Sequence, residues 1–318
     1  AQADIDWLLP EVWDLQKWED PAIIYKKNCS PQLFDKYFEK HRFKLGWHPK
    51  PELDEFGVSV AEDVIRNEKP DLAMIHVSAV DIARHGNGMF GPAIDDAIRK
   101  VDSWLCRLEQ AVSESGRFDE TNFIIVSDHG HLKVDKQVNL NVLFKEEGLI
   151  QTDDHGELVS YQAYCHSSGL SAQILLADAA DTEVRKKVEA ILEYAKDTEA
   201  FGIKAIYTRR EAEEKFQLSG PFEYVVEGVG GVAFAAKWDG RVVINEEDPD
   251  YDYVKTSHGH RPHLGPQPVL LAKGPDFKEN VTIRECSILD EVPTFAAVLG
   301  VEMEGLEGRC LHELLVRP

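Results

Sequence analysis

Two apolar runs, each ending in an aspartate, constrain the fold of this chain most strongly. Residues 72–80 read LAMIHVSAV and lead into Asp81, and residues 123–127 read FIIVS and lead into Asp128. Continuous runs of this length, rich in β-branched residues, are typical of strands buried in a parallel sheet. Between them, apolar residues recur at spacings of three and four over residues 93–112, which predicts a helix with one apolar face. The order predicts a parallel strand–helix–strand unit.

Polar side chains follow each of these runs. Asp81 is followed by His85, Asp128 is followed by His129, and a third cluster, SHGHRPH, begins at Ser257. Because ligands of open parallel sheets bind outside the carboxyl ends of the strands, we expect the first two loops to face one crevice. Carboxylate oxygens and imidazole nitrogens suit zinc, manganese or ferrous iron. Two carboxylates and three imidazoles exceed the needs of one tetrahedral ion, so they predict two ions about 3.5–4 Å apart.

Each part of this pattern has a plainer explanation when it is taken alone. An aspartate and a histidine four residues apart are common on protein surfaces. Asp-His after a strand also fits a helix cap beside a hydrogen-bonded histidine. His258, His260 and His263 lie in a Gly- and Pro-containing stretch and would be ordinary loop histidines. The combination, at equivalent positions of successive sheet elements, favours a metal centre.

The chain is strongly acidic. Its 318 residues carry a formal net charge of −22, with 43% hydrophobic and 29% charged residues, which is typical of a globular protein. Binding to a nucleic-acid backbone needs clustered Lys and Arg, so such a partner is not expected. No apolar run approaches the roughly 18 residues that a membrane span needs. The sequence leaves the oligomeric state open.

The cysteines indicate a reducing compartment. The chain has five, far apart in sequence and without a C-x-x-C pair: Cys29, Cys106, Cys165, Cys286 and Cys310. This pattern suggests neither a zinc ribbon nor a disulfide framework, so we expect a cytoplasmic location. The chain begins AQADIDW without methionine, and a signal peptide ahead of it stays open as the alternative.

The middle of the chain differs from both flanks. The short runs SAQILLA, EYVVE, GVAFAA and RVVI predict strands, and TEVRKKVEAILEYAK predicts an amphipathic helix. We therefore expect residues 1–144 and 251–318 to form a core. Residues 145–250 would form an inserted α+β cap, which we expect to select the substrate.

Three segments resemble the alkaline phosphatase superfamily, and most closely its type I phosphodiesterase/nucleotide pyrophosphatase branch. They read VSAVDIARHGNGMFGP, IIVSDHGH and SHGHRPHLGPQPVLLAKGPDF, and the C-terminal LDEVPTFAAVLG is also similar. The resemblance covers both flanks of the chain and little of the middle. It implies an α/β fold with an alkaline-phosphatase-like three-layer core and a mostly parallel sheet, into which the cap is inserted.

The resemblance also implies a set of metal ligands. Asp81, His85 and His258 match the ligands of one ion, and Asp128 and His129 match ligands of the second. His258 is preferred to its neighbours because it occupies the His-Gly position of the motif. His131 follows the second motif and is not among the expected ligands. Two divalent ions are expected, zinc first and manganese as the alternative.

The family pattern contains two further residues that we do not find. These are an earlier metal-binding aspartate and a nucleophilic threonine or serine that follows it. No threonine precedes Thr121, and the serines ahead of Asp81 do not occupy the family's position. We therefore expect the nucleophile upstream of Ala1, no catalytic nucleophile within the chain, and a chain that is incomplete for catalysis by itself.

Together these features predict a two-metal-dependent hydrolase of phosphate esters. We expect it to act on phosphodiester or nucleotide pyrophosphate bonds through a covalent phospho-threonine or phospho-serine. The expected partner is a nucleotide or another small phosphate ester. The alternatives are a phosphomonoesterase, a phosphonate or sulfate ester hydrolase, a mutase of the same superfamily, or a degenerate member that binds metal without catalysis.

Overall fold

The computed structural model describes residues 5–12, 20–45 and 52–317. These residues fall into two compact units. The first comprises Ala1–Ile82, Asp95–Asp128 and Val269–Pro318, and the second comprises Ala83–Ile94 and His129–Pro268. Helix α5 (Ala79–Asn87) continues across the boundary as one unbroken element. The core and cap boundaries expected from the sequence stay a prediction.

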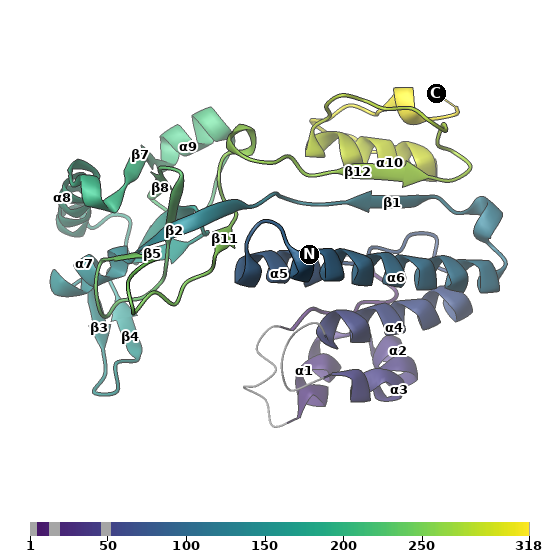
Figure 1. The fold of residues 1–318 in the computed structure, drawn as a ribbon, viewed down its shortest axis with the longest axis horizontal. Helices are drawn as coiled ribbons and strands as arrows, with labels where there is room; N and C mark the ends of the chain where they lie inside the picture. Colours follow the sequence, from purple (N-terminus) through teal and green to yellow (C-terminus); the bar gives the residue numbers. More distant parts are fainter. Residues whose placement is uncertain (1–4, 13–19, 46–51, 318) are drawn as a thin grey trace. The chain divides into compact units, whose positions relative to one another are not determined.

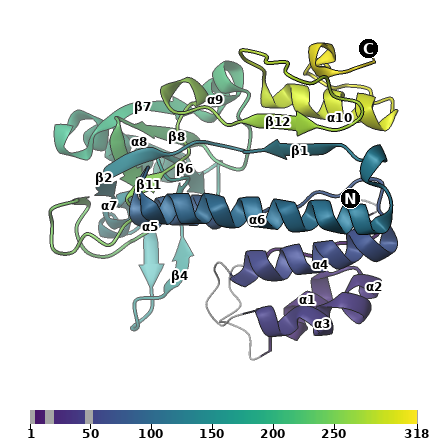
Figure 2. The same cartoon turned by 45° about the vertical axis from the view of Figure 1, so that its right-hand side comes forward.

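The first unit is largely helical. Its elements are α1 (Pro21–Asn28), α2 (Pro31–Leu33), η2 (Phe34–Phe38), α3 (Glu39–His41), η3 (Arg42–Lys44), α4 (Glu52–Glu68), α6 (Pro92–Ser115), η4 (Phe118–Glu120), β1 (Phe123–Val126), β12 (Leu270–Lys273), η7 (Ile288–Asp290), α10 (Glu291–Leu299) and η8 (His312–Leu314). Helix α4 lies along α6, with α1 to α3 on its other side (Figures 1 and 2). Tyr25, Phe38 and Phe56 form an aromatic core between α4 and the short helices. The helix predicted over residues 93–112 is confirmed as α6.

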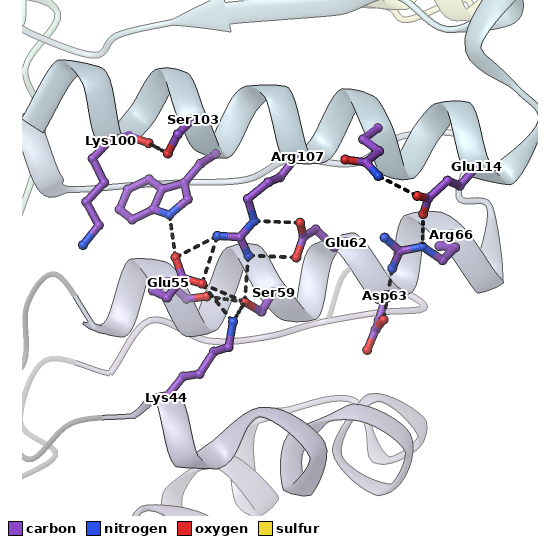
Figure 3. Close-up of polar contacts among 12 residues, drawn as sticks. Lys44, Glu55, Ser59, Glu62, Asp63, Arg66, Lys100, Ser103, Arg107 and Glu114 are labelled. Carbon is purple, nitrogen blue, oxygen red and sulfur yellow. Dashed lines mark hydrogen bonds and ion pairs between the residues drawn. The ribbon is translucent and has the colours of Figure 1, made fainter.

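A polar cluster joins α4 to α6 (Figure 3). Arg107 donates hydrogen bonds of 2.8–2.9 Å to Glu55 and Glu62, and Trp104 donates one of 2.7 Å to Glu55. Burial of the Glu55 carboxyl opposes its ionisation. The hydrogen bonds from Arg107, Lys44 and Trp104 outweigh that effect and lower the pKa of Glu55 to about 2. The two helices are therefore held by ionised groups as well as by apolar packing.

The first unit contains a two-stranded ribbon, formed by β1 and β12. The strands pair antiparallel, with Ile124 opposite Ala272 and Val126 opposite Leu270. In both overall views the ribbon lies between α6 and α10 (Figures 1 and 2). Phe123 packs on the side chains of Ala111 and Val112 from α6. The strand predicted over residues 123–127 is thus confirmed, but its partner is antiparallel.

The predicted strand over residues 72–80 was wrong. Residues 72–78 lie outside any helix or strand, and α5 begins at Ala79. Leu72 is 57% exposed and Met74 is 86% exposed. An apolar run with β-branched residues indicates only that the segment favours burial. To form a strand, the segment also needs a neighbouring strand to which it can hydrogen-bond. Among the described residues no strand pairs with 72–78, so these residues do not form the parallel strand–helix–strand unit.

The second unit is built on sheets. Its elements beside α5 are β2 (Leu132–Val138), α7 (Leu140–Glu146), β3 (Ile150–Thr152), β4 (Leu158–Tyr161), β5 (Ala163–Ser167), β6 (Ser171–Leu176), α8 (Thr182–Asp197), η5 (Glu199–Phe201), β7 (Ile203–Thr208), α9 (Arg209–Phe216), β8 (Tyr224–Gly228), β9 (Gly231–Phe234), β10 (Val243–Asn245), β11 (Thr256–Ser257) and η6 (Pro262–Leu264). Four strands form an antiparallel sheet in the order β5-β6-β8-β7. Strand β2 pairs antiparallel with β10 and β11 and parallel with β9. The strands predicted from SAQILLA, EYVVE, GVAFAA and RVVI are confirmed as β6, β8, β9 and β10.

Helix α8 covers the core of this sheet. Its N-cap Asp181 accepts hydrogen bonds from the backbone N–H groups of Glu183 and Val184, which are otherwise unsatisfied in the first turn. Apolar side chains at spacings of three and four, from Val184 to Ala195, are buried against β-strand residues such as Ile174 and Val226. The helix predicted from TEVRKKVEAILEYAK is confirmed. Among the described helices, none is long and apolar enough to cross a membrane.

Candidate metal centre

Helix α5 carries two of the predicted ligands. Asp81 and His85 are four residues apart, so the helical period places them on one face. The start of the helix is held by buried Asp54 of α4, which accepts hydrogen bonds from the backbone N–H and the hydroxyl of Ser78. Near its end, the carbonyl oxygen of His85 accepts a hydrogen bond of 2.8 Å from the backbone N–H of Lys255. Both ends of the helix are therefore tied to other elements.

The second motif leads directly into β2. His129, Gly130 and His131 immediately precede this strand. A Cβ atom on Gly130 would lie 2.2 Å from the carbonyl oxygen of Pro266. Only glycine fits this approach, so Gly130 allows the backbone to pass close to the segment that follows the third motif.

The third motif is pinned by the turn between β5 and β6. The carbonyl oxygen of His258 accepts a hydrogen bond of 2.8 Å from Leu170, and that of Gly259 accepts one of 2.7 Å from the Ser171 hydroxyl. Gly259 has a φ of +86°, and a Cβ atom there would lie 1.8 Å from the carbonyl oxygen of Ser168. The backbone that presents His258 is thus fixed by several close contacts.

Four imidazole rings meet where these segments converge. The ring centroids of His129 and His258 are 3.9 Å apart, and the two ring planes are nearly parallel. His85 lies 4.8 Å from His131 and 5.2 Å from His258. His131 lies 5.6 Å from both His129 and His258. Histidines from three separate parts of the sequence therefore form one cluster.

This cluster has the chemistry of a metal site. The rings of His85, His129, His131 and His258 lie together in the second unit. Asp81 lies one turn before His85 on α5. Carboxylate oxygen with imidazole nitrogen is a donor set for zinc or manganese. The residues present therefore fit a divalent cation.

The hydrogen bond of His85 determines which of its nitrogens could bind an ion. Its Nδ1 lies 2.7 Å from the carbonyl oxygen of Thr256. A carbonyl oxygen only accepts, so Nδ1 carries the proton and Nε2 presents the lone pair. Nearby, burial and the charges of His129 and His131 lower the pKa of His260. Neutral imidazole is the form that coordinates metal.

The loop that follows His258 is anchored by a buried ion pair. Arg261 donates hydrogen bonds of 2.9 and 3.0 Å to Glu227 of β8, which also pairs with Lys204. Burial opposes ionisation of Glu227, but these hydrogen bonds outweigh it and lower its pKa. The charge pair therefore ties the histidine loop to the antiparallel sheet.

The imidazole cluster of the second unit contains three of the five predicted ligands and adds one that the sequence analysis did not select. The three are His85, His129 and His258. Asp81 lies one turn before His85 on α5, and Asp128 is exposed and adjoins His129 in the chain. The roles of these two carboxylates as ligands stay predictions. His131 joins the set, and so does Thr256 as a hydrogen-bond partner. No sequence motif marked Thr256.

The chain is similar to a known protein family and to proteins of that family. A family described as type I phosphodiesterase/nucleotide pyrophosphatase matches residues 12–261. Two ectonucleotide pyrophosphatase/phosphodiesterases of Caenorhabditis elegans are each 22% identical to this chain, over 87% and 74% of its length. The chain spans only 31% and 25% of the length of those two proteins.

Solved structures of related proteins share the fold. Human ectonucleotide pyrophosphatase/phosphodiesterase 5 aligns with a TM-score of 0.62 at 19% identity, over 83% of this chain and 64% of its own. The murine protein aligns with a TM-score of 0.60 at 18% identity, over 82% and 64%. These likenesses confirm the expected alkaline-phosphatase-like α/β fold. The expectation of a mostly parallel sheet was wrong for the described strands, since only β2 and β9 pair parallel.

Proposed function

Because the chain belongs to the type I phosphodiesterase/nucleotide pyrophosphatase family, we propose that it serves the metal-dependent hydrolysis of phosphodiester or nucleotide pyrophosphate bonds. The observation that carries the proposal is the cluster of four imidazoles in the second unit, those of His85, His129, His131 and His258, with Asp81 one turn before His85 on α5. Imidazoles gathered in this way beside a carboxylate suit transition-metal ions better than a purely structural role.

The proposed ligands are those expected from the sequence. Asp81, His85 and His258 would hold one ion, and Asp128 and His129 would contribute to the second. Zinc is the preferred ion and manganese the alternative. The stacking of the His129 and His258 rings, whose centroids are 3.9 Å apart, supports the closeness of the two sets.

The residues of the chain would hold and orient the reacting groups. When bound, divalent ions stabilise charge on phosphate oxygens and lower the pKa of a bound hydroxyl or water. The Thr256 carbonyl keeps His85 in the tautomer whose Nε2 lone pair is available. The covalent phospho-threonine or phospho-serine stays a prediction.

A nucleotide is the proposed substrate class. A structure of the murine ectonucleotide pyrophosphatase/phosphodiesterase 5, an inactive variant, is described in complex with AMP, and it aligns with this chain at a TM-score of 0.60. The net charge of −22 of this chain would repel a polyanion unless cations intervene locally. The proposed ions would supply that local positive charge.

Metal analysis and two chromogenic esters test the proposal. The purified protein is expected to retain zinc or manganese through gel filtration and to lose it to a chelator. With metal restored, bis(4-nitrophenyl) phosphate should be hydrolysed faster than 4-nitrophenyl phosphate, and AMP should bind only to the metal-loaded protein.

Variants identify the residues that produce these results. His85→Ala should abolish metal retention, whereas His263→Ala, an exposed histidine of the same loop region, should leave it unchanged. A protein that retains no transition metal would refute the metal dependence. Hydrolysis of the monoester alone would refute the phosphodiesterase assignment and favour a phosphomonoesterase.

A further inference from the structure

His131 occupies a position that differs from that of an ordinary core histidine. It is only 2% exposed, yet its ring faces three other imidazoles, those of His85, His129 and His258. Imidazole nitrogens gathered in this way are a donor set for a divalent cation.

The geometry relates His131 to the ligands on α5. Its ring centroid lies 4.8 Å from that of His85 in an edge-to-face arrangement. Asp81 lies one turn before His85 on the same helix. These three residues present one carboxylate and two imidazoles, which is the protein donor set of an open zinc site with room for a further ligand.

Thr256 connects the two imidazoles of this group. Its carbonyl oxygen accepts the hydrogen bond from Nδ1 of His85, and its hydroxyl lies 3.0 Å from Nδ1 of His131. The residue has no exposed surface, and β11 fixes it opposite Lys133 of β2. With both Nδ1 atoms engaged by one residue, coordination would use Nε2 of each ring. Hydrogen bonds of this kind orient metal-bound histidines and fix their tautomers.

We propose that His131 is a metal ligand of this chain, sharing one ion with Asp81 and His85, and that Thr256 positions both imidazoles through its carbonyl and hydroxyl oxygens. The proposal rests on the metal dependence proposed above. It goes beyond the five ligands expected from the sequence, because His131 was not among them.

Calorimetric titration of zinc into the metal-free protein tests the proposal, with cobalt absorption spectra as a second measurement. His131→Leu removes both ring nitrogens while keeping an apolar side chain of moderate size. Thr256→Val removes only the hydroxyl and keeps the β-branched shape that suits a strand. We expect Thr256→Val to weaken zinc binding by about 10- to 100-fold, as removal of such a partner does, and His131→Leu to weaken it further. The cobalt spectrum should change in both variants.

Two substitutions elsewhere control for loss of a buried polar side chain. His41→Leu removes a buried histidine that is hydrogen-bonded to Asp63, and Thr294→Val removes a buried hydroxyl that accepts from Leu311. Both should leave zinc affinity and the cobalt spectrum unchanged. Thermal unfolding of each metal-free variant shows whether the fold is retained.

The outcomes separate this inference from the proposed function. If the unmodified protein binds no zinc, the metal dependence itself is refuted. If it binds zinc and folded His131→Leu binds equally well, His131 is not a ligand, while the proposed function stands. Where His131→Leu does not fold, Thr256→Val decides, since unchanged affinity and spectrum in that variant contradict the positioning role. A fall in affinity equal to that of the two controls would indicate a structural role alone.

Discussion

The two units of the molecule differ in how their apolar strands are covered. In the second unit, Ile174 of β6 and Val226 of β8 have no exposed surface, because strands pair with them and α8 covers the sheet. In the first unit, Leu271 of β12 is 60% exposed and Met74 is 86% exposed. Both units contain apolar, β-rich segments. The comparison shows that such a segment is buried only where neighbouring strands and a covering layer are both present.

The largest expected effect comes from matched substitutions in the two sheets. Ile174→Ala should destabilise the protein by about 2–5 kcal/mol, since it removes buried atoms and leaves a cavity. Leu271→Ala, at an exposed strand position, should cost less than about 0.5 kcal/mol. Urea denaturation gives both free energies. Equal costs would mean that Leu271 is covered in solution, and the contrast between the sheets would fail.

The next largest effect concerns the polar cluster between α4 and α6 (Figure 3). Arg107→Met removes hydrogen bonds to Glu55, Glu62 and Ser59 and leaves partly buried carboxylates without their cation. We expect a cost of about 1–3 kcal/mol, below that of a fully buried pair because the Arg107 side chain is 32% exposed. In the control Arg99→Met, loss of the exposed pair with Asp96 should cost at most about 0.5 kcal/mol. A negligible change in Arg107→Met would show that apolar contacts alone hold the first unit.

Lowering the pH should remove the stability that the same cluster contributes. The pKa of Glu55 falls from its ordinary value of 4.5 to about 2 in the folded protein. A lowered folded-state pKa contributes stability that is fully present above pH 4.5 and is lost as the pH falls from 4.5 towards 2. Glu55→Gln should therefore reduce the loss of stability over that range, measured as urea midpoints at successive pH values.

A carboxyl of the second unit provides the comparison for this titration. The pKa of Glu211 is also lowered to about 2, first by the backbone N–H of Thr208 and then by Lys215 and the Thr208 hydroxyl, but the Glu211 side chain is more exposed than that of Glu55, 42% against 27%. Glu211→Gln should change the loss of stability in acid less than Glu55→Gln does, and added salt should reduce the effect of Glu211→Gln further. A larger effect from Glu211 than from Glu55 would contradict the role assigned to the α4–α6 cluster.

The sequence predicted those parts of the fold that depend on local pattern. Helices α6 and α8 follow from apolar spacing, and β6 and β8 follow from short apolar runs. The segment 72–78 was misassigned because the sequence does not show which strand, if any, lies beside it. The motifs predicted His85 and His258 as metal ligands from their residue types. His131 and Thr256 depend on the pairing of β11 with β2, which no local pattern reveals.

The smallest effect tests whether the contrast between the units extends to local structure. Asp20 caps α1 in the first unit and Asp181 caps α8 in the second, each through a carboxylate that accepts backbone N–H groups. A cap is a local interaction, so replacement by alanine should cost about 1 kcal/mol in either unit, whatever the state of the sheets. Asp20 also pairs with Arg42, but both side chains are exposed and the pair adds little. Chemical denaturation of Asp20→Ala and Asp181→Ala should therefore give similar losses. A much larger cost at Asp181 would mean that the cap supports the sheet core through α8, and the two units would then differ in their helices as well as in their strands.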